Sequence, residues 1–472
     1  MNKMLVALVR QREGFRKNHM LSRIKAFILI VALSFCFTAA AWAGLPEGAA
    51  ALADPGPQQP RRFYLDLNPA ESSQEIPPVA QKQPQRRIVD GRPALYQFKR
   101  AINPLNWLSR TLEATFVSTE SGRLSGLVQR LGGPKKRAGH EIFLGGAGSG
   151  SGLGPGLRFF HRNLFGRGVE VEVPLLITYK DYQVFELNTR FPLLNDGRLN
   201  LDVRGAYRSR PLDNFFGIGN ETAFENRTKF RSVTREVVAG LSSEINEQWS
   251  TGLHLAYRNI GVTDPTGVPS AQDVFDRSKV PGLAGGAELA SLVFSVENDT
   301  KDNRRIPSTG GLRQLEISLN EGIGRGDFSF WRYRADLQQF FSLDSSHRKI
   351  IALRALIETN QEKGGSQVPF FEMATLGGAN SLRSFQNFRF YDKSAVAFLL
   401  EYRYRVWRAF DWALFLEEGQ VAPEPGDFAW DRFHTGYGVR FYIRATPALP
   451  ISFDLGRSRD GWRVYFRFKP SF

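Results

Sequence analysis

Cysteine is almost absent from this chain. Cys36 is the only one in 472 residues, and it lies in an apolar segment that we predict to be removed. Without further cysteines the chain forms no internal disulfide and offers no thiolate ligands to a metal. The six histidines are scattered, with no pair at ligand spacing, so a zinc site is not expected either.

Catalytic motifs are missing as well. The sequence has no G-x-S-x-G motif, and the glycine-rich run at 146–156 fits neither the dinucleotide-binding fingerprint nor a P-loop. We therefore expect neither an enzyme active site nor a cofactor.

Long apolar runs are lacking after Ala43. No later segment approaches the ~18 consecutive apolar residues of a spanning helix, so any later membrane contact must come from strands. Before that point, a short basic stretch from Met20, an apolar run and the small residues of Ala41-Trp42-Ala43 are typical of a signal peptide. We predict that residues 1–43 are a cleaved signal peptide with an N-terminal extension.

The formal net charge of +15 can suggest a nucleic-acid partner, so we counted the charged residues in each part of the chain. Residues 1–43 hold 7 Lys and Arg against 1 acidic residue, residues 44–139 hold 14 against 8, and residues 140–472 hold 41 against 38. Because a nucleic-acid-binding domain would concentrate its charge on a folded face, no such partner is expected. Residues 44–139 are rich in Pro, Ala and Gln, and we expect a mostly disordered periplasmic segment there.

From His140 onward apolar and polar residues alternate with period two, which predicts strands with one apolar and one polar face. About sixteen strands are predicted. Their spans are 140–147, 153–163, 168–179, 182–192, 198–209, 230–245, 249–261, 287–298, 311–321, 328–343, 347–359, 394–407, 411–421, 433–444, 450–456 and 462–471.

Two further patterns indicate that these strands close into a membrane barrel. Arg and Glu occupy one face of nearly every strand, and they must line a lumen because a lipid-facing Arg or Lys at the midplane costs roughly 2–4 kcal/mol. The three longest connections, near 210–229, 262–286 and 360–393, all follow odd-numbered strands and so share one rim. The prediction is an all-β fold: a transmembrane antiparallel β-barrel over residues 140–472, embedded in the lipid of a bacterial outer membrane.

The last predicted strand has the clearest alternation. Arg463, Tyr465, Arg467 and Lys469 lie on one face, and an apolar set occupies the other. The apolar set is Trp462, Val464, Phe466, Phe468 and Phe472. We expect this set to face lipid and to serve as the signal that the barrel-assembly machinery reads during insertion.

Several segments resemble known family blocks. The quoted residues are Leu376–Phe385 (LGGANSLRSF), Arg389–Lys393 (RFYDK), Asn214–Asn220 (NFFGIGN), His161–Gly168 (HRNLFGRG), and Asp299–Asp302 with Pro307–Gly310. Together they resemble the BamA/TamA superfamily, also called bacterial surface antigens, over roughly residues 140–472.

The resemblance implies that the signature loop folds from the outer rim into the lumen, where Arg383 meets acidic residues of the wall. Glu401 and Glu417 are the matching acids, and their strand parity independently places both on the polar face. A guanidinium can engage carboxylates bidentately, which a lysine cannot copy. The other loop positions that the resemblance marks are Phe385 and the turn residues Gly377, Gly378 and Asp392.

The chain also departs from the family pattern. Ser384 stands where the family has glycine, and Glu417 stands where aspartate is usual. Residues 44–139 show no βααββ pattern of the periplasmic POTRA modules that assembly factors of this family carry.

Two functions remain open at this point. The first is assembly, insertion or translocation of proteins, with client outer-membrane proteins or a periplasmic partner, at a poorly sealed seam between the first and last strands. The glycines between Gly145 and Gly156 support such a seam if they weaken the first strand, but they could equally build a flexible hairpin. The second is a passive channel or structural surface antigen plugged by residues 360–393.

Overall fold

The computed structural model describes residues 137–467, except 149, 195–196, 305, 408–409 and 447–448. The predicted signal peptide, nearly all of the Pro-rich segment, and the aromatic residues Phe468 and Phe472 lie outside the described residues.

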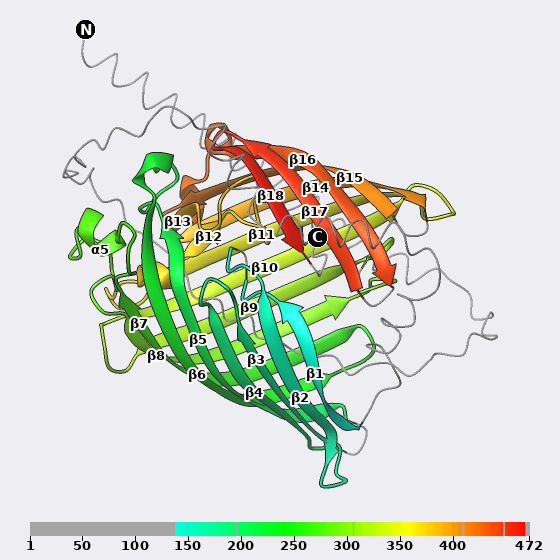
Figure 1. The fold of residues 1–472 in the computed structure, drawn as a ribbon. Coiled ribbons are helices and arrows are strands. Elements are labelled where there is room, and N and C mark those ends of the chain that lie inside the picture. The colour runs from blue at the N-terminus through cyan, green and yellow to red at the C-terminus, as the bar shows by residue number, and fades with distance from the viewer. Residues whose placement is uncertain are drawn as a thin grey trace. The chain divides into compact units, whose positions relative to one another are not determined.

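Sixteen strands form one antiparallel sheet in which each strand pairs with the next one along the chain (Figure 1). They are β1 Ala138–Gly145, β2 Gly154–Leu164, β3 Val169–Ile177, β4 Gln183–Pro192, β5 Leu199–Phe215, β6 Thr228–Glu244, β7 Trp249–Thr263, β8 Ala287–Asp299, β9 Gly310–Gly322, β10 Ser329–Ser342, β11 Lys349–Glu362, β14 Ser394–Trp407, β15 Phe410–Ala422, β16 His434–Thr446, β17 Leu449–Ser458 and β18 Gly461–Arg467. Two short strands, β12 Ala374–Leu376 and β13 Phe390–Asp392, pair with each other inside the β11–β14 connection.

Within the described residues, helical structure is confined to the connections. The short elements are α5 Ala271–Val274 and the 3-10 turns η1 Phe224–Asn226, η2 Phe370–Glu372, η3 Pro425–Asp427 and η4 Trp430–Arg432. Among the described residues, no helix is long and apolar enough to cross a membrane.

The predicted number of wall strands, sixteen, is confirmed, and most boundaries differ by one to three residues. The largest difference is in β5, which runs on to Phe215 where a loop was expected from residue 210. A register shift between Arg210 and Asp213 explains it, because an extra residue in one strand shifts the side-chain alternation while pairing continues to Thr228.

Side chains on the two faces of the sheet differ in the predicted way. In β18, Trp462, Val464 and Phe466 are 58%, 56% and 51% exposed, while Arg463 and Arg467 lie on the opposite, inner face. In β15, Leu414 and Leu416 are exposed, and Glu417 is fully buried. The apolar outer face and the charged inner face are those that a lipid-embedded wall requires.

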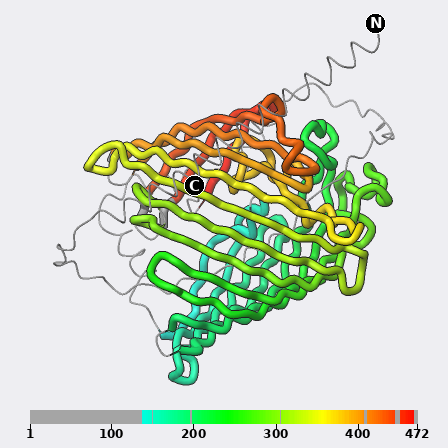
Figure 2. The backbone as a smooth tube through the Cα atoms, turned by 180° about the vertical axis from the view of Figure 1, so that it is seen from behind, coloured from blue at the N-terminus to red at the C-terminus, as the bar shows by residue number. Residues whose placement is uncertain are grey.

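The long connections share one rim. Residues 216–227, 264–286 and 363–393 follow β5, β7 and β11, whereas connections at the other rim, such as 165–168 and 245–248, are short. Neighbouring strands are antiparallel, so alternate connections fall on the same side. Seen from behind, the strands from green to orange lie side by side with a common tilt (Figure 2). By the loop-length pattern of outer-membrane barrels, the long-loop rim is the outer one.

The glycine-rich segment belongs mainly to the first hairpin rather than to the first strand. Gly145 ends β1, and Gly148, Gly150 and Gly152 in the connection have φ of 111°, 82° and 76°. This backbone region is open to glycine at little cost. The support that these glycines lent to a weakened first strand is therefore withdrawn. Within the described residues β1 and β18 stand at the two ends of the sheet order and are not hydrogen-bonded to each other.

The assignment of the rims predicts which side of the membrane each connection occupies. In a Cys36→Ser background, a cysteine at Thr266 in the β7–β8 connection should react with an impermeant maleimide in intact cells. A cysteine at Ser345 in the β10–β11 turn should react only after the outer membrane is opened. Both residues are exposed, so a difference in labelling reports sidedness. If only Ser345→Cys were labelled in intact cells, the barrel would have the opposite orientation in the membrane, with the long connections on the periplasmic side.

Candidate functional site

The β11–β14 connection, residues 363–393, folds back against the inner face of the wall. Its β12–β13 hairpin packs against β11, β14 and β15 (Figure 1). The wall makes room with small residues, because Ala395 and Ala397 of β14 are buried in the same cluster as Leu382 and Phe385 of the loop. We call residues 363–393 the lumenal loop.

A buried carboxylate anchors the first part of the lumenal loop. Glu372, which is fully buried, accepts from Arg258 Nη1 of β7 at 2.5 Å and from Arg332 Nη2 of β10 at 2.6 Å. Arg258 also donates to Asn320 Oδ1 at 2.9 Å. A buried ion is tolerated when it is paired and hydrogen-bonded in this way, so Glu372 fixes where the loop enters the lumen.

A glycine turn then reverses the loop. Gly377 and Gly378 have φ of 112° and 99°. A Cβ on Gly377 would lie 2.1 Å from the Gln386 carbonyl oxygen, so a side chain is excluded by contact as well as by conformation. The Gly378 N–H donates to the Leu382 and Phe385 carbonyls, at 3.0 and 3.2 Å. The two predicted turn glycines therefore bring the segment with Arg383 to the wall.

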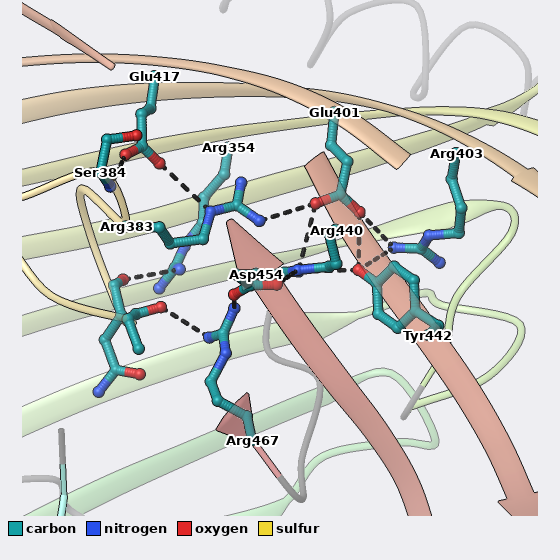
Figure 3. Close-up of polar contacts among 12 residues, drawn as sticks. Arg354, Arg383, Ser384, Glu401, Arg403, Glu417, Arg440, Tyr442, Asp454 and Arg467 are labelled. Atoms are coloured by element: carbon teal, nitrogen blue, oxygen red, sulfur yellow. Dashed lines mark hydrogen bonds and ion pairs between the residues drawn. The ribbon is translucent and has the colours of Figure 1, made fainter. Parts of the chain in front are cut away.

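Arg383 lies between the two acids that the sequence singled out (Figure 3). Its Nη1 donates to Glu401 Oε2 at 2.8 Å and its Nε to Glu417 Oε2 at 3.2 Å. The guanidinium carbon lies 4.2 Å from the centroid of the Phe415 ring, which adds a cation–π contact. Arg383 is 1% exposed and both acids are fully buried, so these charges interact without screening by water.

Ser384 packs into the space that two glycines of the wall leave open. A Cβ on Gly436 would lie 2.6 Å from Ser384 Cβ, and one on Gly456 would lie 2.8 Å from Ser384 Oγ. The Ser384 N–H donates to Glu417 Oε1 at 2.5 Å. The space for the serine is thus provided by β16 and β17, and the Glu417 carboxylate reaches both the guanidinium and this backbone N–H.

Glu401 is the centre of a larger network that sequence reasoning missed. It also accepts from Arg403 Nη2 at 3.2 Å, from the Tyr442 hydroxyl at 2.7 Å, and pairs with Arg440 Nη1 at 3.2 Å. Arg440 in turn binds Asp454, whose Oδ2 accepts from Arg467 of β18 at 2.7 Å.

The network returns to the lumenal loop through its backbone. Arg467 Nη1 donates to the Ala379 carbonyl at 2.6 Å, and Arg354 Nη1 of β11 donates to the Asn380 carbonyl at 3.0 Å (Figure 3). A closed circuit therefore runs from Arg383 through Glu401, Arg440, Asp454 and Arg467 back to the loop. Each link is a charge-assisted hydrogen bond or ion pair, the stronger class of such contacts.

The inner-rim turn between β8 and β9 also contacts this network. Ile306, Pro307 and Ser308 are buried, and the Pro307 carbonyl accepts from Arg403 Nη1 at 3.2 Å. Arg403 therefore links the turn after the Asp299–Asp302 block to the carboxylate that binds Arg383 of the lumenal loop.

Phe385 and Asp392 complete the predicted set. Phe385 is fully buried, 5.4 Å from Phe390 between ring centroids, and its carbonyl accepts from the Tyr465 hydroxyl of β18 at 2.9 Å. Asp392 belongs to β13, away from Arg383, and its Oδ1 accepts from the Lys393 N–H at 2.7 Å. Burial raises the pKa of the Asp392 carboxyl to about 8, although Lys393 opposes the shift.

Comparison with known proteins identifies the fold family. Residues 163–470 match the Omp85 superfamily domain. The chain belongs to the Omp85 superfamily. No curated protein sequence matches it. Among solved structures, BamA from Haemophilus ducreyi lacking POTRA domains 1–3 is 16% identical, with a TM-score of 0.55 over 71% of this chain and 70% of that one.

Two CdiB structures are similar at a lower level. CdiB from Escherichia coli is 14% identical, with a TM-score of 0.47 over 71% of this chain and 62% of that one. CdiB from Acinetobacter baumannii is 11% identical, with a TM-score of 0.46 over 70% and 59%.

These findings confirm the expected resemblance and fold: this Omp85 protein is an outer-membrane β-barrel. Within the part of the chain that the structure describes, no group of three or more His, Cys, Asp and Glu side chains could hold a metal ion. The polar chemistry of the site is ion pairing that positions a loop.

The pairing of Arg383 predicts its effect on the lumenal loop. Arg383→Ala should destabilise the inserted loop by about 3–5 kcal/mol, because Glu417 loses its guanidinium partner inside the protein. We expect faster proteolysis within residues 363–393 and altered heat-modifiable gel mobility. Arg277→Ala, at an exposed loop position, is the control. Wild-type behaviour of Arg383→Ala in both assays would mean that the pairing has no structural role.

The raised pKa of Asp392 predicts a pH dependence. With the loop inserted the carboxyl stays protonated to about pH 8, whereas in the unfolded chain it ionises near pH 4. Ionisation therefore favours the unfolded chain, and stability falls as pH rises from about 4 to about 8. Thermal midpoints at pH 5 and pH 8 should differ less in Asp392→Asn than in wild type. Asp273→Asn, at an exposed position of α5, should retain the wild-type difference, and equal differences in all three proteins would contradict the prediction.

Proposed function

We propose that this Omp85 protein takes part in the insertion or translocation of other proteins at the outer membrane. The observation that carries the proposal is that the lumenal loop is hydrogen-bonded to the last strand, β18. Arg467 and Tyr465 of β18 donate to the Ala379 and Phe385 carbonyls, so the loop contacts one end of the sheet directly.

The end strands offer the chemistry that a client strand needs. A strand at the end of a sheet presents backbone N–H and C=O groups that can pair with another chain. β1 and β18 are the ends of the described sheet order. In the proposed function, loss of the β18 contacts to the lumenal loop frees the last strand to move, and a client strand adds at the exposed edge.

The contact at the inner rim extends this proposal to a periplasmic partner. The β8–β9 turn meets Arg403 through the Pro307 carbonyl, and Arg403 contacts Glu401, which binds Arg383. A partner that displaced this turn would disturb the same carboxylate that holds the loop.

A passive channel is the second candidate, and one observation favours it. Ion pairs on the inner face of the early strands are less buried than those around Glu401: the Arg158 side chain is 35% exposed and Glu141 40%. These residues therefore line a part of the lumen that is more accessible to water than the part covered by the lumenal loop. In this function the loop would restrict conductance without serving clients.

Depletion separates the two functions. If the protein assembles clients, lowering its amount should reduce the levels of other outer-membrane barrels, and expression of the wild-type chain should restore them. Arg383→Ala should restore them less well, and Arg277→Ala fully.

Unchanged barrel levels with normal lipid asymmetry after depletion would remove the assembly function. If deletion of residues 363–393 then raised single-channel conductance in planar bilayers, the results would support a passive channel.

A further inference from the structure

Two arginines lie on the outer, lipid-facing side of β6. Arg231 and Arg235 are both exposed and four residues apart, so their side chains leave the same face of the strand. The Arg235 guanidinium carbon lies 6.0 Å from the centroid of the Tyr207 ring. Among residues 137–467 that the structure describes, neither arginine has a hydrogen bond or ion pair.

The height of these arginines follows from strand geometry. Ile245 and Trp249 are 59% and 39% exposed at the inner-rim end of the β6–β7 hairpin, and Leu241 and Val237 continue the apolar face. Ten residues separate Ile245 from Arg235. At about 3.4 Å per residue and a tilt of about 40°, they rise about 25 Å, which is the height of the apolar band of such barrels.

Arg235 therefore lies at the outer boundary of the apolar band, and Arg231 lies about 10 Å beyond it by the same geometry. Aromatic side chains mark the same level, since Tyr207 pairs with Arg235 across the strands and stacks on Phe185 at 5.8 Å. Aromatic rings gather at this boundary in membrane proteins. Both guanidinium groups thus face the headgroup layer of the outer leaflet.

The strands on either side of β6 place no carboxylate beside Arg231 or Arg235. The cross-strand partners on β7 are Thr263 for Arg231 and Asn259 for Arg235, and both are neutral. Glu288 shares this face but lies one strand further, on β8, where it accepts from Asn259 Nδ2 at 2.9 Å. The acidic neighbour in sequence, Glu236, points inward and pairs with Arg208.

We propose that Arg231 and Arg235 bind the phosphorylated saccharide headgroup of an outer-leaflet glycolipid. A guanidinium engages phosphate oxygens bidentately, and two of them without counter-charges attract an anionic headgroup. The spacing in height selects the class of lipid: a headgroup built of several sugars with phosphates can reach both arginines, whereas a phospholipid places its single phosphate in one thin layer beside Arg235. Val237 and Leu241 lie below, where acyl chains would contact the wall. The site is on the outside of the barrel and does not rest on the proposed function.

Binding of defined lipids to the purified full chain tests the site. The probes are diphosphoryl lipid A, the same lipid without phosphates, and phosphatidylglycerol, each titrated by native mass spectrometry. The wild type should retain diphosphoryl lipid A most strongly. The double variant Arg231→Gln, Arg235→Gln should bind it at least tenfold more weakly, since each basic residue near a charged lipid surface contributes about fivefold.

The controls decide between the remaining explanations. Arg277→Gln removes an exposed arginine from the β7–β8 connection and should leave lipid A binding unchanged. Heat-modifiable mobility verifies that each variant is folded. Equal binding of lipid A with and without phosphates, or an equal loss of phosphatidylglycerol in the double variant, would overturn the assignment to a phosphorylated glycolipid. Unchanged lipid A binding in the double variant would remove the site.

Discussion

The Glu401 carboxylate, buried among three guanidinium groups, sets the arrangement of the lumen. Arg383, Arg403 and Arg440 all contact it, and the Tyr442 hydroxyl donates to it. An ion taken out of water costs several kcal/mol unless partners replace its hydration. Ionised side chains are costly within the apolar band of the membrane, so the wall directs them inward there, and where the lumenal loop covers them they must be matched by opposite charges. The loop supplies one of those charges itself.

The shape of the loop follows from the same requirement applied to its backbone. A hairpin pressed against a wall leaves carbonyl groups without water, and buried polar groups need partners. Arg354 of β11 and Arg467 of β18 supply donors to the Asn380 and Ala379 carbonyls. Gly436 and Gly456 leave the space that Ser384 fills. Side chains of the wall therefore determine both the position of the loop and its conformation.

Much of the wall was predictable because its signal is local. Period-two alternation fixes which residues share a face, and it placed Glu401, Glu417 and Arg467 inward without knowledge of the fold. It cannot tell which inward charges meet, since that depends on strand register and on the path of a 31-residue connection. The contacts of Arg440 with Glu401 and Asp454, and those of Arg354 and Arg467 with the loop carbonyls, were therefore not predicted, although the alternation shows which face of its strand each of these side chains occupies. The β5 extension was missed because the shift between Arg210 and Asp213 interrupts the alternation on which the prediction relied.

Because the lumenal loop is tied to both the inner-rim turn and β18, its position and the freedom of the last strand are coupled. Arg467 serves Asp454 and the Ala379 carbonyl at once, so moving β18 breaks a wall contact and a loop contact together. Hydrogen bonds to charged groups contribute about 1.5–3 kcal/mol each, which is enough to keep a strand in place and small enough for a partner to overcome. Displacement of the loop would lower the cost of moving β18, and displacement of β18 would loosen the loop. In the proposed function, the same network of contacts therefore holds the lumenal loop inside the barrel and keeps β18 in place at the end of the sheet.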